Sequence, residues 1–175
     1  MLVGKKADNK IQIRIANHTD RHTIYGMRHS VYATELSQHA ENEELTLTDS
    51  LDEFNVYIVA EIDDKVVGFI SITPPDKNTY SIDKYLSRDS LPFTIDDSTF
   101  EIRILTIDKN SRGSRIAALL MYASLRWIES NGGIRVVVIG RVDLLDLYNK
   151  IGLKNTGIQV NSGALAFELM TVTIN

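Results

Sequence analysis

The chain has 175 residues, 43% of them hydrophobic and 24% charged, which is the composition of an ordinary globular domain with a proper core. Lys and Arg total 19 against 23 for Asp and Glu, and the net charge of −4 argues against general nucleic-acid binding. The lack of cysteine excludes disulfides, thiolate metal sites and a Cys nucleophile. Without a signal peptide or an apolar run near the ~20 residues of a membrane span, we expect a cytoplasmic protein that does not enter a membrane.

The chain begins with a polar segment, a strand and a helix. Residues 1–10 are predicted to be a flexible N-terminus, and residues 11–175 a single domain. Ile11–Ile15 alternates apolar and polar residues, as a strand with one buried face does. A helix that either Thr19 or Asp20 can cap runs to about Leu36.

The middle of the chain predicts an acidic loop over residues 37–54, then two strands at 55–62 and 66–73 joined by a tight turn. Residues 76–98 are long, polar and poorly periodic, yet they carry scattered large apolar groups. We expect this segment to be a mobile cover over a functional site, outside the core.

The second half predicts alternating strands and helices. They are a buried strand from Phe100, a helix from about 116 to 130, a strand at 134–139, a helix from about 143 to 152 and a closing strand at 164–172.

A polar turn between the strand at Phe100 and the following helix carries Arg112, Gly113, Ser114 and Arg115. The first N–H groups of a helix lack helical partners, and the helix dipole is positive at this end. The turn therefore predicts an anion site suited to a pyrophosphate. A plain turn with solvated arginines is the alternative on these residues alone.

Two motifs together resemble the GNAT superfamily (the GCN5-related N-acetyltransferases). Arg112-x-x-Arg115-x-Ala117 stands where that family has its phosphate turn, and Tyr148-x-x-x-Gly152-Leu153 stands where it has a Tyr-x-x-x-Gly-Phe pattern. Three positions depart from the family: Arg115 replaces a glycine, Leu153 replaces a phenylalanine, and Asp143 lies where an asparagine is common.

The resemblance implies an α/β fold with a mixed, mostly antiparallel central sheet and helices on both faces, opened as a V between two parallel central strands. It implies acetyl-CoA or another acyl-CoA as donor substrate. The residues implied to hold the donor are Leu105, Ile107, Arg112, Gly113, Ser114, Arg115, Ile116, Ala117 and Asp143.

A narrower resemblance rests on Met27–Leu36, Asp52-Glu53, residues 76–98 and Glu101–Leu105. These segments are similar to the long-chain N-acyl amino acid synthases and, more faintly, to the acyl-homoserine-lactone synthases. Those relatives accept longer acyl groups, often from acyl carrier protein.

Two residues are candidates for the chemistry that the resemblance implies. Glu101 is the candidate general base for the acceptor amine, with a solvated or salt-bridged strand glutamate as the alternative. Tyr148 is the candidate acid that protonates the departing thiolate, with a packing tyrosine as the alternative. No metal is expected, because His18 and His22 have no evident third ligand.

The expected function is direct transfer of an acyl group to the primary amine of a small molecule or amino acid. No acyl-enzyme is expected, since there is no cysteine and no activated serine is apparent. Acyl carrier protein or aminoacyl-tRNA as donor, and an inactive acyl-CoA-binding module, are the rivals. A homodimer is left open.

Overall fold

The protein was analysed as a computed structural model that describes residues 10–113 and 115–174. The prediction for residues 1–10 therefore lies almost wholly outside the described residues, as does the phosphate-binding role expected of Ser114.

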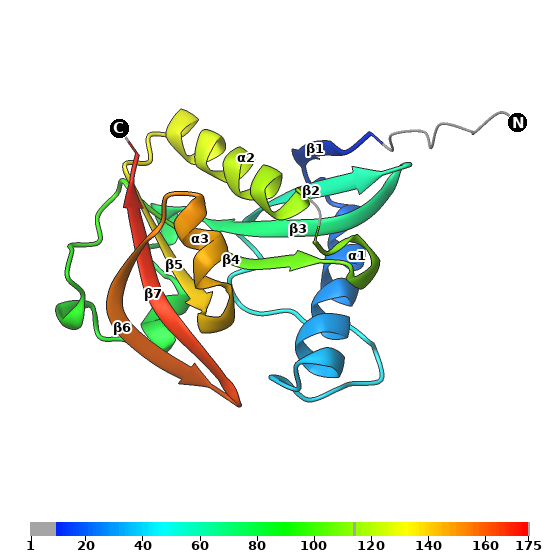
Figure 1. Ribbon diagram of the computed structural model, residues 1–175, viewed down its shortest axis with the longest axis horizontal. Helices are drawn as coiled ribbons and strands as arrows, with labels where there is room; N and C mark the ends of the chain where they lie inside the picture. The colour runs from blue at the N-terminus through cyan, green and yellow to red at the C-terminus, as the bar shows by residue number, and fades with distance from the viewer. Residues whose placement is uncertain (1–9, 114, 175) are drawn as a thin grey trace, which may run out of the picture.

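A seven-stranded sheet in the order β1-β2-β3-β4-β5-β7-β6 forms the framework (Figure 1). Its strands are β1 (Gln12–Ile15), β2 (Val56–Ile62), β3 (Lys65–Thr73), β4 (Thr99–Ile107), β5 (Arg135–Arg141), β6 (Lys154–Ser162) and β7 (Leu165–Thr173). Only β4 and β5 pair in parallel; the other neighbours are antiparallel. The expected mixed sheet is confirmed, with β6 as an additional edge strand that the sequence pattern did not reveal.

In the described part of the chain, three α-helices pack on this sheet: α1 (Asp20–Arg28), α2 (Ile116–Ser130) and α3 (Leu145–Lys150). Helix α1 continues without a break into a π-helix, η1 (His29–Glu35), so the predicted helix to about residue 36 is confirmed. Asn131 is the C-cap of helix α2, and Gly132, the next residue, takes a φ of +81°. Among the described residues, no helix combines the length and the apolar character that a membrane crossing needs.

The core lies on both faces of the sheet. On one face, α2 and α3 pack on side chains such as Ile58, Ile70 and Val138. On the other face, Ile24 of α1 packs on Tyr57, Val59 and Phe69. Alternation along the strands therefore places successive residues in different layers, as a two-faced sheet requires.

The prediction that residues 76–98 stay outside the core is wrong for the middle of the segment. Tyr80 and Ile82 are 2% and 0% exposed and pack on Val137 and Leu169, on the face of β5 and β7 opposite to α3. The Tyr80 hydroxyl donates to the carbonyl of Thr99 over 2.8 Å. The scattered apolar groups cover a sheet face, and the segment folds into short 3₁₀ turns, including η3 (Ser81–Lys84).

The two parallel strands separate partway along their length. They pair only between Thr99–Ile102 and Arg135–Val138, and β4 then runs on to Ile107 without pairing to β5. The expected V-shaped opening between the central strands is confirmed, and it creates a gap that side chains from both faces of the sheet can enter.

Candidate active site

A β-bulge in β4 lies beside the gap. In the register between β3 and β4, Phe69 pairs with Thr106 and Ser71 pairs with Arg103. One residue of β3, Ile70, therefore lies opposite two residues of β4, Ile104 and Leu105. Ile104 takes a φ of +50°, a conformation that β-branched residues avoid. The bulge turns the backbone at Leu105 toward the gap, as bulges next to active sites commonly do.

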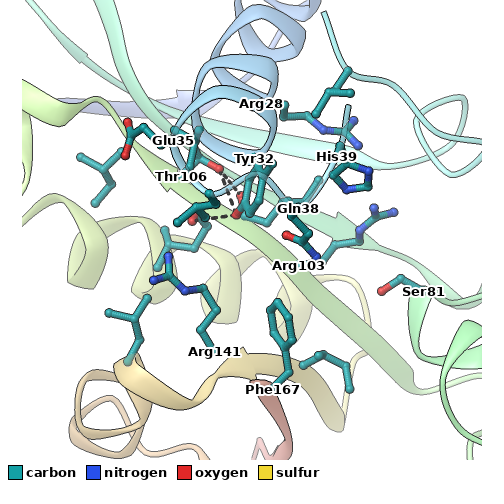
Figure 2. A pocket seen from close by; sticks show the side chains of 18 of the residues that line it. Arg28, Tyr32, Glu35, Gln38, His39, Ser81, Arg103, Thr106, Arg141 and Phe167 are labelled. Atoms are coloured by element: carbon teal, nitrogen blue, oxygen red, sulfur yellow. Dashed lines mark hydrogen bonds between the residues drawn. The ribbon is translucent and has the colours of Figure 1, made fainter. Parts of the chain in front are cut away.

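A cavity of about 640 Å³ fills the gap (Figure 2). Its walls come from η1, the bulged end of β4, the end of β5, the turn before α2, and α3. Predicted donor-site residues on the wall are Leu105, Ile107, Arg112, Gly113 and Ala117, and the predicted acid Tyr148 joins them. The structure thus brings two sequence motifs, about 30 residues apart in the chain, to one cavity.

Arg112, at the edge of this cavity, is already paired. Its two Nη atoms lie 2.8 and 2.9 Å from the carboxylate oxygens of Glu35, and its Nε donates to the carbonyl of Ile107 over 3.1 Å. The hydrogen bonds from Arg112 hold the pKa of Glu35 below its ordinary value. An anionic ligand at Arg112 would compete with this carboxylate.

Three predicted donor-site residues do not line the cavity. Arg115 is exposed at the start of α2, and the Ile116 side chain packs in the core at 0% exposure. Asp143 is exposed and pairs with Arg141, Nη2 to Oδ2 at 2.6 Å. Arg141, which the sequence reading did not single out, lies on the cavity wall instead.

Tyr148 is 6% exposed and packs on β5. Gly140 makes this approach feasible, because a Cβ at that position would lie 2.9 Å from Cε2 of the Tyr148 ring. Burial is the main cause that raises the pKa of Tyr148 well above the ordinary tyrosine value, and the charge of Arg141 only partly opposes it. The phenol therefore keeps its proton at neutral pH and is available as an acid.

Glu101 is buried behind the cavity wall. Its carboxylate accepts hydrogen bonds from the Ser81 N–H (2.8 Å), the Ser81 hydroxyl (2.6 Å) and the Ile82 N–H (3.1 Å). Burial raises the pKa of Glu101, against the hydrogen bonds from Ser81 and the charge of Arg103. Of Glu101 and its two hydrogen-bond partners Ser81 and Ile82, only Ser81 lines the cavity. A base role for Glu101 therefore requires a relay through the Ser81 hydroxyl.

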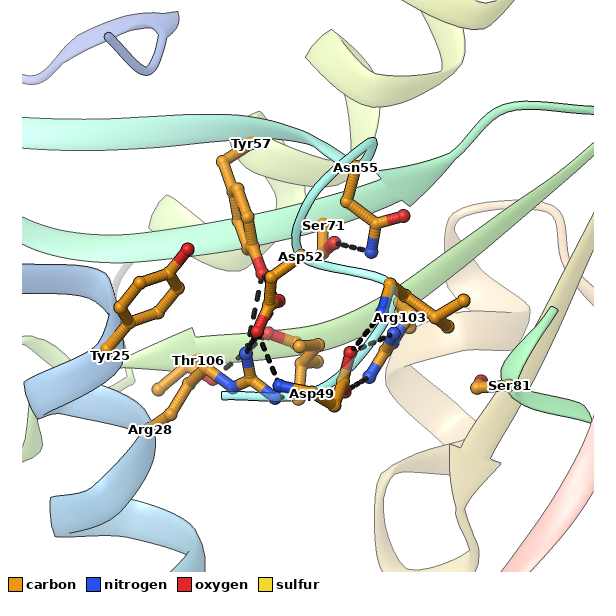
Figure 3. Close-up of polar contacts among 12 residues, drawn as sticks. Tyr25, Arg28, Asp49, Asp52, Asn55, Tyr57, Ser71, Ser81, Arg103 and Thr106 are labelled. Atoms are coloured by element: carbon orange, nitrogen blue, oxygen red, sulfur yellow. Dashed lines mark hydrogen bonds and ion pairs between the residues drawn. The ribbon is translucent and has the colours of Figure 1, made fainter. Parts of the chain in front are cut away.

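The far end of the cavity rests on a buried ionic network (Figure 3). Arg28 Nη1 lies 2.8 Å from both carboxylate oxygens of Asp52, and its Nη2 lies 3.1 Å from Asp49. Arg103 pairs with the same Asp49, and the Tyr57 hydroxyl donates to Asp52. Burial alone would raise the pKa of Asp49, but hydrogen bonding and charge from Arg103, with the charge of Arg28, hold it at about 2.

Positive charge dominates the cavity wall. Its cations are Arg28, Lys84, Arg103, Arg112 and Arg141, and its carboxylates are Glu35 and Asp49. His39 also lies on the wall, outside every motif that the sequence reading used. No group of three or more metal-ligating side chains is found within the described part of the chain.

A sheet that opens between two parallel strands, with a bulge beside the gap and a basic turn leading into a helix, defines an acyltransferase of the N-acetyltransferase type. The model of the acetyltransferase (GNAT) family matches residues 23–153, and the chain belongs to this family. No curated protein matches the sequence itself.

Solved structures share the fold at low sequence identity. The acyl-homoserine-lactone synthase LasI is 15% identical with a TM-score of 0.79, covering 95% of this chain and 91% of its own. The CoA-dependent acyl-homoserine lactone synthase BjaI, solved with SAM and isopentyl-CoA, is 18% identical with a TM-score of 0.78, covering 95% and 84%. The protein YncA of Salmonella typhimurium, solved with its cofactor acetyl-CoA, is 14% identical with a TM-score of 0.67, covering 94% of each chain.

Proposed function

We propose that the protein transfers an acyl group from acyl-CoA to the primary amine of a small acceptor that carries a carboxylate. The observation that supports this most is the continuity of one cavity. It runs from the basic turn at Arg112, past the bulge at Leu105 and the Tyr148 ring, to the cationic end at Arg103. Donor phosphates, reacting carbonyl and anionic acceptor would each meet a suitable surface.

The donor would lie along the turn and the gap. Arg112 would exchange Glu35 for a phosphate, since a charge-assisted bond to phosphate is among the stronger hydrogen bonds. The thioester carbonyl would sit at the bulge, where a backbone N–H can stabilise developing negative charge. Apolar wall residues would accept the acyl chain; they are Ile139, Leu144, Leu147 and Phe167. The solved complexes of BjaI with isopentyl-CoA and of YncA with acetyl-CoA support a CoA donor.

The acceptor would enter at the opposite end. Arg103 and Lys84 lie on this wall, and their charge exceeds that of Asp49, the one carboxylate that the described residues place on the wall there. An acceptor carboxylate would be oriented by this surplus of positive charge. The amine would then point toward the thioester carbonyl of the donor beside Leu105. This orientation favours amino-acid-like acceptors over simple alkylamines.

The reaction would proceed by direct attack. The neutral amine adds to the carbonyl carbon, the C–S bond breaks, and Tyr148 gives its proton to the leaving thiolate. Tyr148 regains a proton from the nitrogen of the intermediate, so the products are an amide and free CoA. Glu101, acting through Ser81, is the sequence-derived candidate for the base.

Thiol release tests the proposal. Because the chain has no cysteine, a thiol reagent added to the reaction reports only the CoA that is set free. Acetyl-, octanoyl- and palmitoyl-CoA should each be offered with the free amino acids and, in parallel, with the matching decarboxylated amines. We expect amine-dependent thiol release that is faster with the amino acids. Equal rates with both acceptor sets would exclude carboxylate recognition, and no release with any pair would exclude the transferase.

A carrier-protein donor is the second candidate. Lys109 and Arg115 are exposed on the turn beside Arg112, and a basic rim of this kind suits an acidic carrier surface. Acylated carrier protein in the same assay decides between the donors, since the preferred donor will show the higher kcat/KM.

A further inference from the structure

The cavity contains few groups that can take a proton from an incoming ammonium ion. Among the described residues on its wall, only Glu35, Asp49 and His39 are carboxylates or imidazoles. Arg112 pairs with Glu35 in two-point fashion, and Arg103 and Arg28 pair with Asp49. Both carboxylates are therefore held in their ionised form and are weak bases.

His39 differs from these carboxylates. Within the described part of the chain its imidazole makes no hydrogen bond or ion pair, and its side chain is exposed toward the cavity and solvent. Its backbone is nevertheless fixed, because its N–H donates to the carbonyl of Tyr32 over 3.1 Å, beside the 2.9 Å bond from Gln38 to the same oxygen. The structure thus presents an unpaired imidazole on an anchored stretch of backbone.

The anchor is tied to the reaction centre. The Tyr32 hydroxyl lies 3.5 Å from the carbonyl oxygen of Leu105 and 3.5 Å from the Thr106 hydroxyl, at the bulge. Figure 2 shows His39 with Arg28, Gln38 and Arg103 around the part of the cavity assigned to the acceptor. An amine bound there would lie between the imidazole and the bulge.

We propose that His39 is a catalytic residue: it accepts a proton from the ammonium group of the acceptor before attack. This inference rests on the proposed acyl transfer. The ammonium N–H bond breaks, its electron pair stays on nitrogen, and the proton passes to the imidazole and then to solvent. The neutral amine forms the C–N bond, and the second proton leaves nitrogen for the thiolate through Tyr148, so the step needs no further reactant.

The surroundings of His39 keep it in the neutral form that a base requires. Partial desolvation at the cavity wall is the first cause that lowers the pKa of His39, and the positive charges of Arg28 on α1 and Lys84 on η3 lower it further, while Asp49 on the loop of residues 36–55 partly opposes them. The imidazole is therefore mostly unprotonated at pH 7, and the protonated, inactive form accumulates only in more acidic solution.

The test is the pH profile of kcat/KM for His39→Gln with octanoyl-CoA and the best amino-acid acceptor of the wild type. At pH 7 we expect kcat/KM to fall about 10²-fold, the scale of a lost general base. The loss should shrink as pH rises past the pKa of the acceptor amine, because the amine is then already neutral. Imidazole added to His39→Ala should restore part of the rate, in proportion to its free-base concentration.

Two comparisons separate this proposal from its rivals. His22→Gln, at an exposed histidine of α1 away from the cavity, should behave as wild type. Octanoyl-CoA affinity measured by calorimetry should be unchanged in His39→Gln, which excludes a lost donor contact. The acid limb is the fall of kcat/KM at low pH. If this limb is unchanged in His39→Gln but is lost in Ser81→Ala or Glu101→Gln, the proposal for His39 is overturned and the proposed acyl transfer is unaffected. If the wild-type protein turns over no acceptor, both the proposed acyl transfer and the role of His39 are contradicted.

Discussion

At the scale of single residues, burial raises the pKa of Tyr148, so its hydroxyl stays protonated at neutral pH. The ring is packed against Gly140, so the hydroxyl has little freedom to leave the cavity. A phenol in this position can act as an acid without first being charged, which suits a leaving group that departs as a thiolate.

Tyr148→Phe keeps the ring and removes the hydroxyl. We expect kcat to fall about 10²-fold while donor affinity stays nearly constant, because the interaction exists only in the transition state. Steady-state rates with calorimetry of acyl-CoA binding check this. Tyr122→Phe, at a 63% exposed tyrosine of α2, is the control. A Tyr148→Phe enzyme with wild-type kcat would reduce Tyr148 to a packing residue.

Arg112 and Glu35 form an ion pair that would have to open for donor phosphates to bind Arg112, as proposed. Arg112→Ala should weaken acyl-CoA binding about fivefold or more, through loss of a charge-assisted bond to phosphate. Glu35→Gln should tighten binding about two- to fivefold, since an exposed ion pair of modest strength no longer competes. Calorimetry on both variants decides the point; a Glu35→Gln protein that binds more weakly would show that Glu35 supports the site.

Some of these residues could be predicted from the sequence, because their motifs are local. Others could not, because their role depends on neighbours that only the fold brings close. Arg112 and Tyr148 sit in motifs whose spacing is local, so their place on the cavity wall could be predicted. The surroundings of Glu101 depend on a segment twenty residues earlier folding back onto the sheet. His39 and Arg141 lie on the cavity wall only because the fold brings distant segments together. No periodic pattern in the sequence indicates this position.

At the scale of secondary-structure elements, the strongly patterned segments were predictable and the weakly patterned ones were not. Strand β5 is a nearly continuous apolar run, and helix α2 has a clear apolar period. Strand β6 was missed because it is an edge strand whose residues are mostly exposed. The switch from α1 to a π-helix also leaves no simple signal, although such segments often occur at functional sites, and η1 supplies Tyr32 and Glu35 to the cavity.

The contact between β5 and α3 leaves no room for a methyl group at Gly140. In Gly140→Ala the new Cβ would lie 2.9 Å from the Tyr148 ring and 3.1 Å from Met170 Sδ. We expect unfolding free energy to drop by about 1–3 kcal/mol, as overpacking does, and kcat to drop with it because the ring is displaced. Urea unfolding and steady-state rates measure both.

Gly26→Ala provides the matched control. Gly26 lies inside α1, and the nearest atom to a new Cβ is the Leu45 carbonyl oxygen at 3.9 Å. This variant should gain up to about 1 kcal/mol from helix propensity. Equal behaviour of the two alanine variants would contradict the tight packing of Tyr148.

At the scale of the whole molecule, the buried ionic network connects separate parts of the chain. Arg28 of α1, Asp49 and Asp52 of the 36–55 loop, Tyr57 of β2 and Arg103 of β4 meet in it. The network fastens a loop with no regular structure to the sheet, and Asp49 presents its carboxylate at the cavity wall.

Asp49 should make stability depend on acidity. Its pKa is about 2 in the folded protein against an ordinary 3.8, so its contribution is complete above about pH 5 and is lost as the pH falls through 3.8 toward 2. After allowance for solvent screening of this part-exposed carboxylate, the lowered pKa corresponds to about 1–2 kcal/mol of unfolding free energy. Urea unfolding of wild type and Asp49→Asn from pH 7 to pH 2 should show a difference that narrows across this window. Asp89→Asn, at an exposed carboxylate outside the ionic network, is the matched control.

The separation of β4 from β5 gives the cavity walls on both sides of the sheet. Tyr148 of α3 reaches it from one face, and Tyr32 of η1 reaches it from the other. In the proposed reaction, donor and acceptor would occupy this cavity together, and neither would have to leave before the other arrives. The steady-state consequence is a ternary complex: double-reciprocal plots at several acceptor concentrations should intersect, and parallel lines should not be observed.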